Sequence, residues 1–161
     1  MTSADDEVQV DRAILSEQLI AKALGGLIKF KEMRPNFFIG NENPEFHAPT
    51  YKYCDGGDPS IAVSRLPSVQ SEEVRLITGV CQPGQGTPLH NHTGEELMFA
   101  ASGSWVVYFD AEEKNKVFLD PWDALLLPGG VPRGWRNVGD TLGCFLNISA
   151  VTDKMSLVRS G

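Results

Sequence analysis

The feature that most constrains this chain is a group of metal-ligand residue types between two glycines, within residues 84–103. His90 and His92 are two residues apart, which on a β-strand places both side chains on one face with Cα atoms about 6.6 Å apart. Glu96 follows four residues later and offers a carboxylate oxygen. Two neutral imidazoles and a carboxylate suit iron, manganese, nickel or zinc. The stretch therefore predicts a divalent-metal site.

The spacing of five residues in this stretch resembles the first signature of the cupin superfamily, Gly-x5-His-x-His-x3-Glu-x6-Gly. The matching residues are Gly84, His90, His92, Glu96 and Gly103. The resemblance implies an all-β fold, an antiparallel cupin barrel (a double-stranded β-helix or jelly roll), with its core at about residues 74–151. It also implies that the two histidines and the glutamate are the metal ligands.

Residues 122–137 fit the second cupin signature, Gly-x5-Pro-x-Gly-x2-His-x3-Asn, only in part. The matches are Pro128, Gly130 and Asn137. Trp122 stands where the signature has a glycine, and Arg133 stands where it has the last metal-binding histidine. The chain therefore lacks one of the four ligands that the family usually has.

Arg133 is open to two interpretations. An arginine stays protonated and only donates hydrogen bonds, so it is not itself a metal ligand. It pairs with a carboxylate such as Glu96 in a metal-free site, or it binds a substrate carboxylate or phenolate beside a metal. In the second case Arg133 is the candidate catalytic residue, because it would offset charge that develops on oxygen. His47 is either an ordinary loop histidine or the missing fourth ligand.

Composition bounds the class of protein. The chain has 161 residues, of which 42% are hydrophobic and 22% charged, as expected for one soluble domain. Its net charge of −7 argues against a nucleic-acid or anionic-membrane partner, because each would need a basic face. No apolar run approaches the roughly 18 residues of a membrane span. The three scattered cysteines and the acidic N-terminus predict reduced thiols and a cytoplasmic location.

The chain begins with an acidic stretch, residues 1–11, which we expect to be a flexible tail before a single cupin domain at residues 12–161. Apolar residues recur with helical spacing over residues 13–24, with Asp11 as N-cap and two glycines as the stop. The apolar stripe of this helix needs a surface to cover. The outside of the barrel or a partner subunit would serve, and we predict packing on the outside of the barrel. We also predict a homodimer, because the barrels of the family that the chain resembles often pair and the helix needs burial.

About ten short β-prone runs follow, separated by Gly, Pro, Asn and Asp, as in a sandwich or barrel. They lie at residues 27–30, 36–39, 50–54, 61–66, 74–80, 95–100, 104–110, 116–119, 124–127, 133–137 and 142–151.

Alternation along the strands predicts which side chains share the interior. If Glu96 points inward, so does Met98, while Glu95 stays solvated. If Arg133 points inward, Trp135 shares its face. Met98, Arg133 and Trp135 are therefore the candidate substrate pocket, unless such side chains merely fill a narrow barrel. For residues 142–151, alternation does not say which set faces inward.

Two classes of function compete. In the first, the chain is a metal-dependent cupin enzyme for a small-molecule substrate, and its 2-His-1-Glu set leaves open positions at the ion, as in non-haem iron oxygenases. The resemblance favours an oxygenase of a small anionic, aromatic or keto, molecule, with iron ahead of manganese, nickel or zinc. In the second, the chain is a non-catalytic or metal-free cupin that binds a small ligand, which the loss of the fourth ligand favours.

Overall fold

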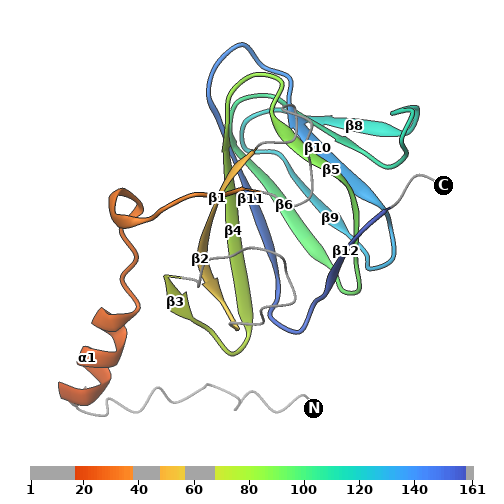
Figure 1. The fold of residues 1–161 in the computed structure, drawn as a ribbon. Helices are drawn as coiled ribbons and strands as arrows, with labels where there is room; N and C mark the ends of the chain where they lie inside the picture. The colour runs from red at the N-terminus through yellow and green to blue at the C-terminus, as the bar shows by residue number, and fades with distance from the viewer. Residues whose placement is uncertain (1–16, 38–47, 57–67, 159–161) are drawn as a thin grey trace, which may run out of the picture.

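Two β-sheets face each other and close into a barrel (Figure 1). The computed structural model describes residues 17–37, 48–56 and 68–158. In these ranges every strand pair is antiparallel except a short parallel contact between β2 and β3. The prediction of an all-β antiparallel barrel with an N-terminal helix is therefore confirmed.

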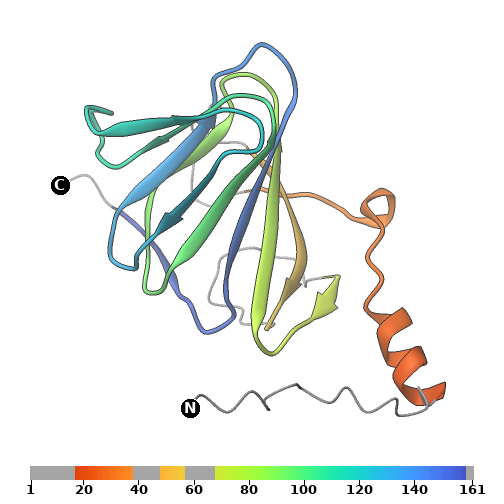
Figure 2. The same cartoon turned by 180° about the vertical axis from the view of Figure 1, so that it is seen from behind.

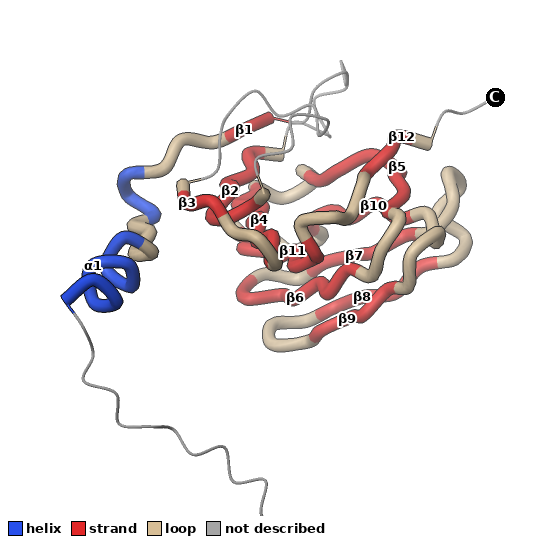
Figure 3. Tube along the Cα trace, turned by 90° about the horizontal axis from the view of Figure 1, so that it is seen from below, coloured by secondary structure: helices blue, strands red, loops and turns tan. Residues whose placement is uncertain are grey.

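The larger sheet has seven strands in the order β1-β2-β4-β11-β6-β9, with β3 beside β2. These strands are β1 (Asn36–Phe37), β2 (Pro49–Asp55), β3 (Val69–Gln70), β4 (Val74–Cys81), β6 (Glu96–Ser102), β9 (Ala124–Leu127) and β11 (Gly143–Ala150). The smaller sheet has five strands in the order β12-β5-β10-β7-β8. These strands are β5 (Gly86–His92), β7 (Trp105–Tyr108), β8 (Lys116–Leu119), β10 (Arg133–Asn137) and β12 (Met155–Leu157). Figure 3 shows both sheets around a common interior.

The barrel is larger than the predicted core of residues 74–151, because β1 to β3 and β12 also join the sheets. No separate run was predicted for β3 or β12, since each is a very short strand held by its pairing with a neighbour. The predicted run at residues 61–66 and His47 lie outside the described residues, as do residues 1–16 with the proposed N-cap Asp11.

An aromatic cluster fills the interior between the sheets. The ring of Trp105 stacks on Phe145 with centroids 4.7 Å apart and meets Trp135 edge-on at 5.7 Å. Gly79 of β4 passes beneath Trp135, and a Cβ at that position would lie 2.5 Å from the indole ring. A glycine is therefore required there for the ring to pack against the sheet.

The glycines of the first signature sit where the backbone needs a positive φ. Gly84 has φ of 84° and Gly103 has φ of 80°. Trp122 occupies the glycine position of the second signature, and its φ of 78° lies in the same left-handed region. Such a conformation is strained for a bulky residue. The indole of Trp122 meets Phe99 edge-on, with centroids 6.0 Å apart, and stays 77% exposed.

The N-terminal helix, α1 (Glu17–Gly25), ends at the predicted glycine but does not pack on the barrel. It buries none of its residues, and Figures 1 and 2 show it apart from both sheets. The prediction of packing against the barrel of the same chain is therefore wrong. The predicted strand at residues 27–30 is also wrong, since a 3₁₀ turn, η1 (Phe30–Glu32), begins there. No helix in the described ranges is long and apolar enough to cross a membrane.

Candidate metal centre

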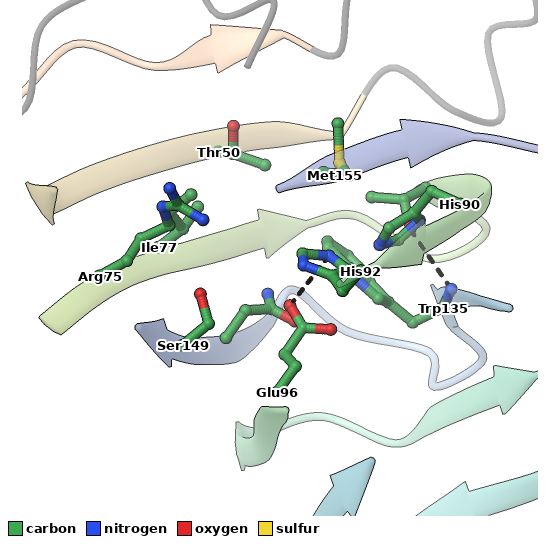
Figure 4. A pocket seen from close by; sticks show the side chains of 11 residues that line it. Thr50, Arg75, Ile77, His90, His92, Glu96, Trp135, Ser149 and Met155 are labelled. Carbon is green, nitrogen blue, oxygen red and sulfur yellow. Dashed lines mark hydrogen bonds and ion pairs between the residues drawn. The ribbon is translucent and has the colours of Figure 1, made fainter. Parts of the chain in front are cut away.

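Three buried side chains from the two sheets converge in the barrel interior (Figure 4). His90 and His92 come from β5 of the five-stranded sheet, and Glu96 begins β6 of the seven-stranded sheet. The chain crosses between the sheets within this short interval, so the imidazoles face the carboxylate. One ligand atom of each residue lies within 4.8 Å of the others. These three residues could therefore hold one metal ion together. We call these residues the metal cluster.

Hydrogen bonds fix the orientation of both imidazoles. Nδ1 of His90 lies 2.8 Å from the carbonyl oxygen of Pro88, which only accepts, so Nδ1 carries the proton. Nδ1 of His92 likewise donates to Oδ2 of Asp153. The Nε2 atoms therefore hold the lone pairs that a metal needs. Nε2 of His92 lies 3.5 Å from Oε1 of Glu96, so a cation between them would be bound by both.

Burial sets the charge state of the cluster. Burial lowers the pKa of His90 to about 3, despite the opposing hydrogen bond to Pro88, so the imidazole is neutral and ready to ligate at neutral pH. Burial raises the pKa of Glu96, while the nearby His92 and Arg133 act in the opposite direction. A bound cation would favour the ionised carboxylate, which couples metal affinity to pH.

Asp153 orients His92 and has no counterpart in the sequence signatures. It lies in the turn before β12, and its Oδ1 accepts hydrogen bonds from the Gly94 backbone at 2.8 Å and the Thr93 hydroxyl at 3.1 Å. Burial would raise the pKa of Asp153, but the hydrogen bonds from His92, Gly94 and Thr93 outweigh it and lower the pKa. Asp153 is therefore an ionised partner of a ligand histidine, an arrangement that increases the basicity of the ligand.

A network of buried charges holds Asp153 in place. The Arg75 guanidinium donates to the Asp153 carbonyl oxygen at 3.1 Å and lies 3.6 Å from its carboxylate. Arg75 also donates to Oδ1 of Asp55 at 3.0 Å, and Lys52 lies 2.9 Å from Oδ2 of Asp55. We call Lys52, Asp55, Arg75 and Asp153 the supporting network. This network connects the metal ligands to strands β2 and β4 of the larger sheet.

Arg133 lies beside the metal cluster, where the second signature has its histidine. It is opposite His90 in the strand register and completely buried. Its Nη2 donates to the Pro128 carbonyl oxygen at 3.0 Å, and its Nε lies 3.8 Å from Oε2 of Glu96. Burial lowers the pKa of Arg133, while the charges of Glu96 and Asp153 raise it.

Several polar atoms at this point lack a hydrogen-bond partner within the described residues. They are Nε and Nη1 of Arg133 and Oε2 of Glu96. Buried polar atoms are nearly always hydrogen-bonded in native proteins, and a buried donor without an acceptor costs about 1–3 kcal/mol. The arrangement therefore favours a bound group that supplies acceptors to Arg133 and a cation to Glu96.

A cavity of about 60 Å³ opens beside the cluster, which is room for several water-sized groups. Its lining combines the ligands with polar and apolar side chains: Thr50, Arg75, Ile77, Thr87, His90, His92, Glu96, Trp135, Asn147, Ser149 and Met155. Strand pairing settles the direction that alternation left open in β11, because Asn147 and Ser149 face this cavity. Such a mixture of a few polar groups on apolar walls suits a small organic molecule.

The predicted pocket residues occupy different places. Trp135 lines the cavity, whereas Arg133 is not one of its lining residues and lies 3.8 Å from Glu96, which is. Met98 is fully buried in the hydrophobic core, outside the cavity lining, so its contact with a substrate stays a prediction. Glu95 is exposed, as alternation predicted. Asp153 and Arg75 were missed, since no local spacing connects them to the histidines.

Residues 78–149 match the family model described as Cupin domain. No curated protein matches the chain in sequence. The fold is similar to that of the polyketide cyclase RemF from Streptomyces resistomycificus, with a TM-score of 0.61 and 16% identity over 84% of this chain and 86% of that one.

Two other solved structures are similar. The DMSP lyase DddQ from Ruegeria pomeroyi has a TM-score of 0.57 and 18% identity, over 98% of this chain and 70% of that one. A cupin-like protein from Thermotoga maritima has a TM-score of 0.56 and 14% identity, over 71% of this chain and 78% of that one. At such identities these likenesses establish the shared fold alone.

Proposed function

We propose, from the premise that this chain is a member of the cupin superfamily, that it is a metal-dependent enzyme acting on a small anionic organic molecule. The observation that carries this proposal is that hydrogen bonds already hold both histidines in the orientation and tautomer that a metal ligand needs. Both histidines commit Nδ1 to acceptors outside the cluster, and the lone pair at Nε2 of His92 is turned toward Glu96. Residues that merely filled a narrow barrel would not need this polar arrangement.

The donor set supports iron as the resident ion, with manganese, nickel and zinc as the other candidates. When bound by two imidazoles and one carboxylate, iron would supply redox chemistry with dioxygen at open coordination positions. We therefore propose an oxygenase-type reaction. The buried position of all three ligands supports this assignment, because it keeps bulk water from the reacting groups.

Arg133 would bind and orient the substrate. The formal charges of Glu96 and Arg133 cancel and His90 is neutral, so a divalent ion would leave the site with a charge of about +2 that attracts an anion. Two nitrogens of Arg133 have no acceptor in the described residues and can donate to a carboxylate or enolate oxygen. Trp135 and Ile77 in the cavity wall provide apolar contacts for an aromatic or keto body.

A metal-free binding protein is the alternative, and one observation favours it. The Arg133 guanidinium lies 3.8 Å from Glu96, so it partly neutralises the carboxylate that a metal would otherwise need. In this case the cavity would bind an anionic ligand through Arg133 without chemistry.

Metal analysis of protein produced without a polyhistidine tag distinguishes the metal-dependent enzyme from the metal-free binding protein. The enzyme predicts close to one first-row metal ion per chain, lost in the His90→Ala/His92→Ala variant and kept in a Glu95→Ala control. Dioxygen uptake is then measured with a panel of small aromatic and keto acids. Metal-free protein that still binds such acids would favour the alternative, and metal retained by the double variant would place the ion elsewhere.

We also propose a cytoplasmic location. All three cysteines, Cys54, Cys81 and Cys144, are free thiols, which supports a reducing compartment. Cell fractionation tests this, and recovery of the protein outside the cytoplasm would contradict it.

A further inference from the structure

Strand register arranges the inward side chains of the seven-stranded sheet in rows that cross β4, β11 and β6. The row at the level of the metal cluster is polar, because Ser149 of β11 stands between Arg75 and Glu96 (Figure 4). Four residues earlier on β11, Phe145 belongs to the apolar core. The inner face of β11 therefore passes from the metal cluster to the core over two rows, each about 6.6 Å from the next.

Asn147 stands in the row between them and is the polar exception there. Its neighbours in the register are Ile77 of β4 and Met98 of β6, both apolar. Asn147 is only 9% exposed, lines the cavity, and has an Oδ1 atom without a hydrogen-bond partner among the described residues. A buried polar atom without a partner destabilises a protein. A side chain that only filled the barrel would therefore be apolar at this position.

Another buried asparagine, Asn137 of β10, shows how this fold satisfies such a side chain. Its Nδ2 donates to the carbonyl oxygens of Cys81 and Thr141, each at 2.9 Å, and its Oδ1 accepts from the Gly139 backbone at 2.9 Å. Asn137 is a structural residue, because its polar atoms are matched inside the chain. The same residue type at position 147 is buried without such a match at Oδ1, which indicates that a bound molecule supplies the partner.

The neighbours of Asn147 define the chemistry of that partner. Its Oδ1 is an acceptor, so the bound group must donate, which excludes a carboxylate. Arg75 lines the same cavity, and its positive charge disfavours an ammonium group. Three of the five N–H groups of Arg75 are donated to oxygens of the chain, so the others can donate further. A neutral hydroxyl group fits, because it donates to Asn147 and also accepts from Arg75 or the hydroxyl of Ser149.

We propose that Asn147 and Ser149 form a subsite for a hydroxyl group of the substrate, which is therefore a small hydroxy acid. This inference rests on the proposed function, in which a bound ion and Arg133 hold the anionic end of the molecule. The hydroxyl group would lie one row further along β11, with Ile77 and Trp135 against the body of the molecule. Such a subsite rejects the analogue without the hydroxyl, because Oδ1 then stays buried without a partner. Asn147 is the specificity-determining residue.

Thermal unfolding of the Asn147→Leu variant tests the subsite without any ligand. Leucine has the branched shape of asparagine and lacks the unpartnered oxygen, so the melting temperature of the metal-free protein should rise by about 2–4 °C. Asn137→Leu is the matched control. Its melting temperature should fall, because the backbone groups that Asn137 contacts lose their partners.

Isothermal titration with two matched pairs of acids tests the ligand class. The pairs are benzoate with 4-hydroxybenzoate, and pyruvate with 3-hydroxypyruvate, and the protein is loaded with zinc so that no oxidation occurs. The wild type should bind the hydroxylated member of at least one pair about tenfold more tightly or better. In Asn147→Leu this preference should fall to within about twofold, while the acid without the hydroxyl still binds.

Three results would overturn the proposal: a melting temperature lowered by Asn147→Leu, a wild type that prefers neither hydroxylated acid, and a preference that survives in Asn147→Leu. The same titrations of metal-free protein separate the subsite from the proposed enzyme. A hydroxyl preference in a protein that binds no metal would keep the subsite and contradict the enzyme. Bound metal and dioxygen uptake without any hydroxyl preference would support the enzyme and contradict the subsite.

Discussion

The interior of this barrel contains two adjacent groups of buried charges that are organised in different ways. In the supporting network, Asp55 is paired with both Lys52 and Arg75, and Asp153 is paired with His92 and Arg75. In the metal cluster, the ion-pair contacts of Glu96 with described residues are long, 3.5 Å to His92 and 3.8 Å to Arg133. Asp153 belongs to the first group and contacts the second.

The contrast distinguishes structural charges from functional ones. Charges that fold the protein are matched inside the chain, because an unmatched buried charge costs several kcal/mol. The atoms of Glu96 and Arg133 that lack a partner among the described residues favour a bound group that would satisfy them. Removal of a network residue should therefore affect stability first, and removal of a cluster residue should affect binding first.

The largest expected effect is on the metal cluster itself. The His90→Ala/His92→Ala variant leaves Glu96 as the one remaining donor of the cluster, so divalent-metal affinity should fall by about 1,000-fold or more. Chelator competition measures the affinity, and thermal unfolding of the metal-free forms checks the fold. Glu95→Ala, at an exposed neighbouring position, is the control. A double variant that binds metal as the wild type does would remove the distinction between the two groups.

The next effect is on stability, through the supporting network. Asp55→Asn leaves the buried Lys52 without its carboxylate partner and Arg75 with Asp153 as its remaining carboxylate in the network, so it should lower the free energy of unfolding by about 3–5 kcal/mol. Urea unfolding at neutral pH measures it. The same change at the exposed Asp140 should have little effect. A variant as stable as the wild type would mean that the pairing of these charges contributes little.

Asp153 joins the two groups, and its removal should affect binding more than a purely structural residue would. Asp153→Asn keeps the shape but removes the charge that His92 Nδ1–H contacts, so metal affinity should fall by about 10–100-fold. Isothermal titration with a divalent metal measures this, with Asp140→Asn again as the control. A loss of stability with unchanged metal affinity would assign Asp153 to the network alone.

Arg133 should separate metal binding from ligand binding. Arg133→His restores the fourth donor of the family pattern and removes a nearby positive charge, so metal affinity should rise. Affinity for an anionic ligand should fall by about ten- to a hundredfold, the value of one charge-assisted hydrogen bond of about 1.5–3 kcal/mol. Calorimetric titration of metal, and then of a carboxylate ligand, measures both affinities.

Arg136→His is the matched control for Arg133→His, because Arg136 lies on the same strand and faces outward toward Glu113. Both affinities should stay as in the wild type. Unchanged affinities in Arg133→His as well would mean that Arg133 does not act on the site.

The smallest effect is a pH dependence of the network. Burial alone would raise the pKa of Asp55, but Lys52 and Arg75 outweigh it and lower the pKa below its ordinary value. A depressed folded-state pKa stabilises the protein above the unfolded value near 3.9, and this contribution is lost as pH falls through the folded-state pKa. The stability difference between wild type and Asp55→Asn should be constant from neutral pH to about pH 5 and shrink below about pH 4. Urea unfolding across this pH range measures the difference. A stability difference that grows on acidification would contradict the prediction.

The sequence alone predicted the metal cluster because its geometry is local. Alternation on one strand puts His90 and His92 on the same face, and a short crossing places Glu96 opposite them. The positions of Glu95 and Trp135 followed from the same rule. The strand runs were predictable because β-prone residues alternate with turn residues over most of the barrel.

Only the tertiary structure decided which distant groups complete the site. Asp153 lies 61 residues from His92, and Arg75 lies 78 residues from Asp153, so no local spacing connects them. Pairing of β11 with β4 and β6 chose Asn147 rather than Leu146 for the interior, although alternation allowed both. The helical spacing around α1 predicted a helix but not its place, because packing depends on which surface is within reach. Backbone geometry determines neighbours within a strand, whereas long-range pairing and the burial of charge determine which strands and turns meet.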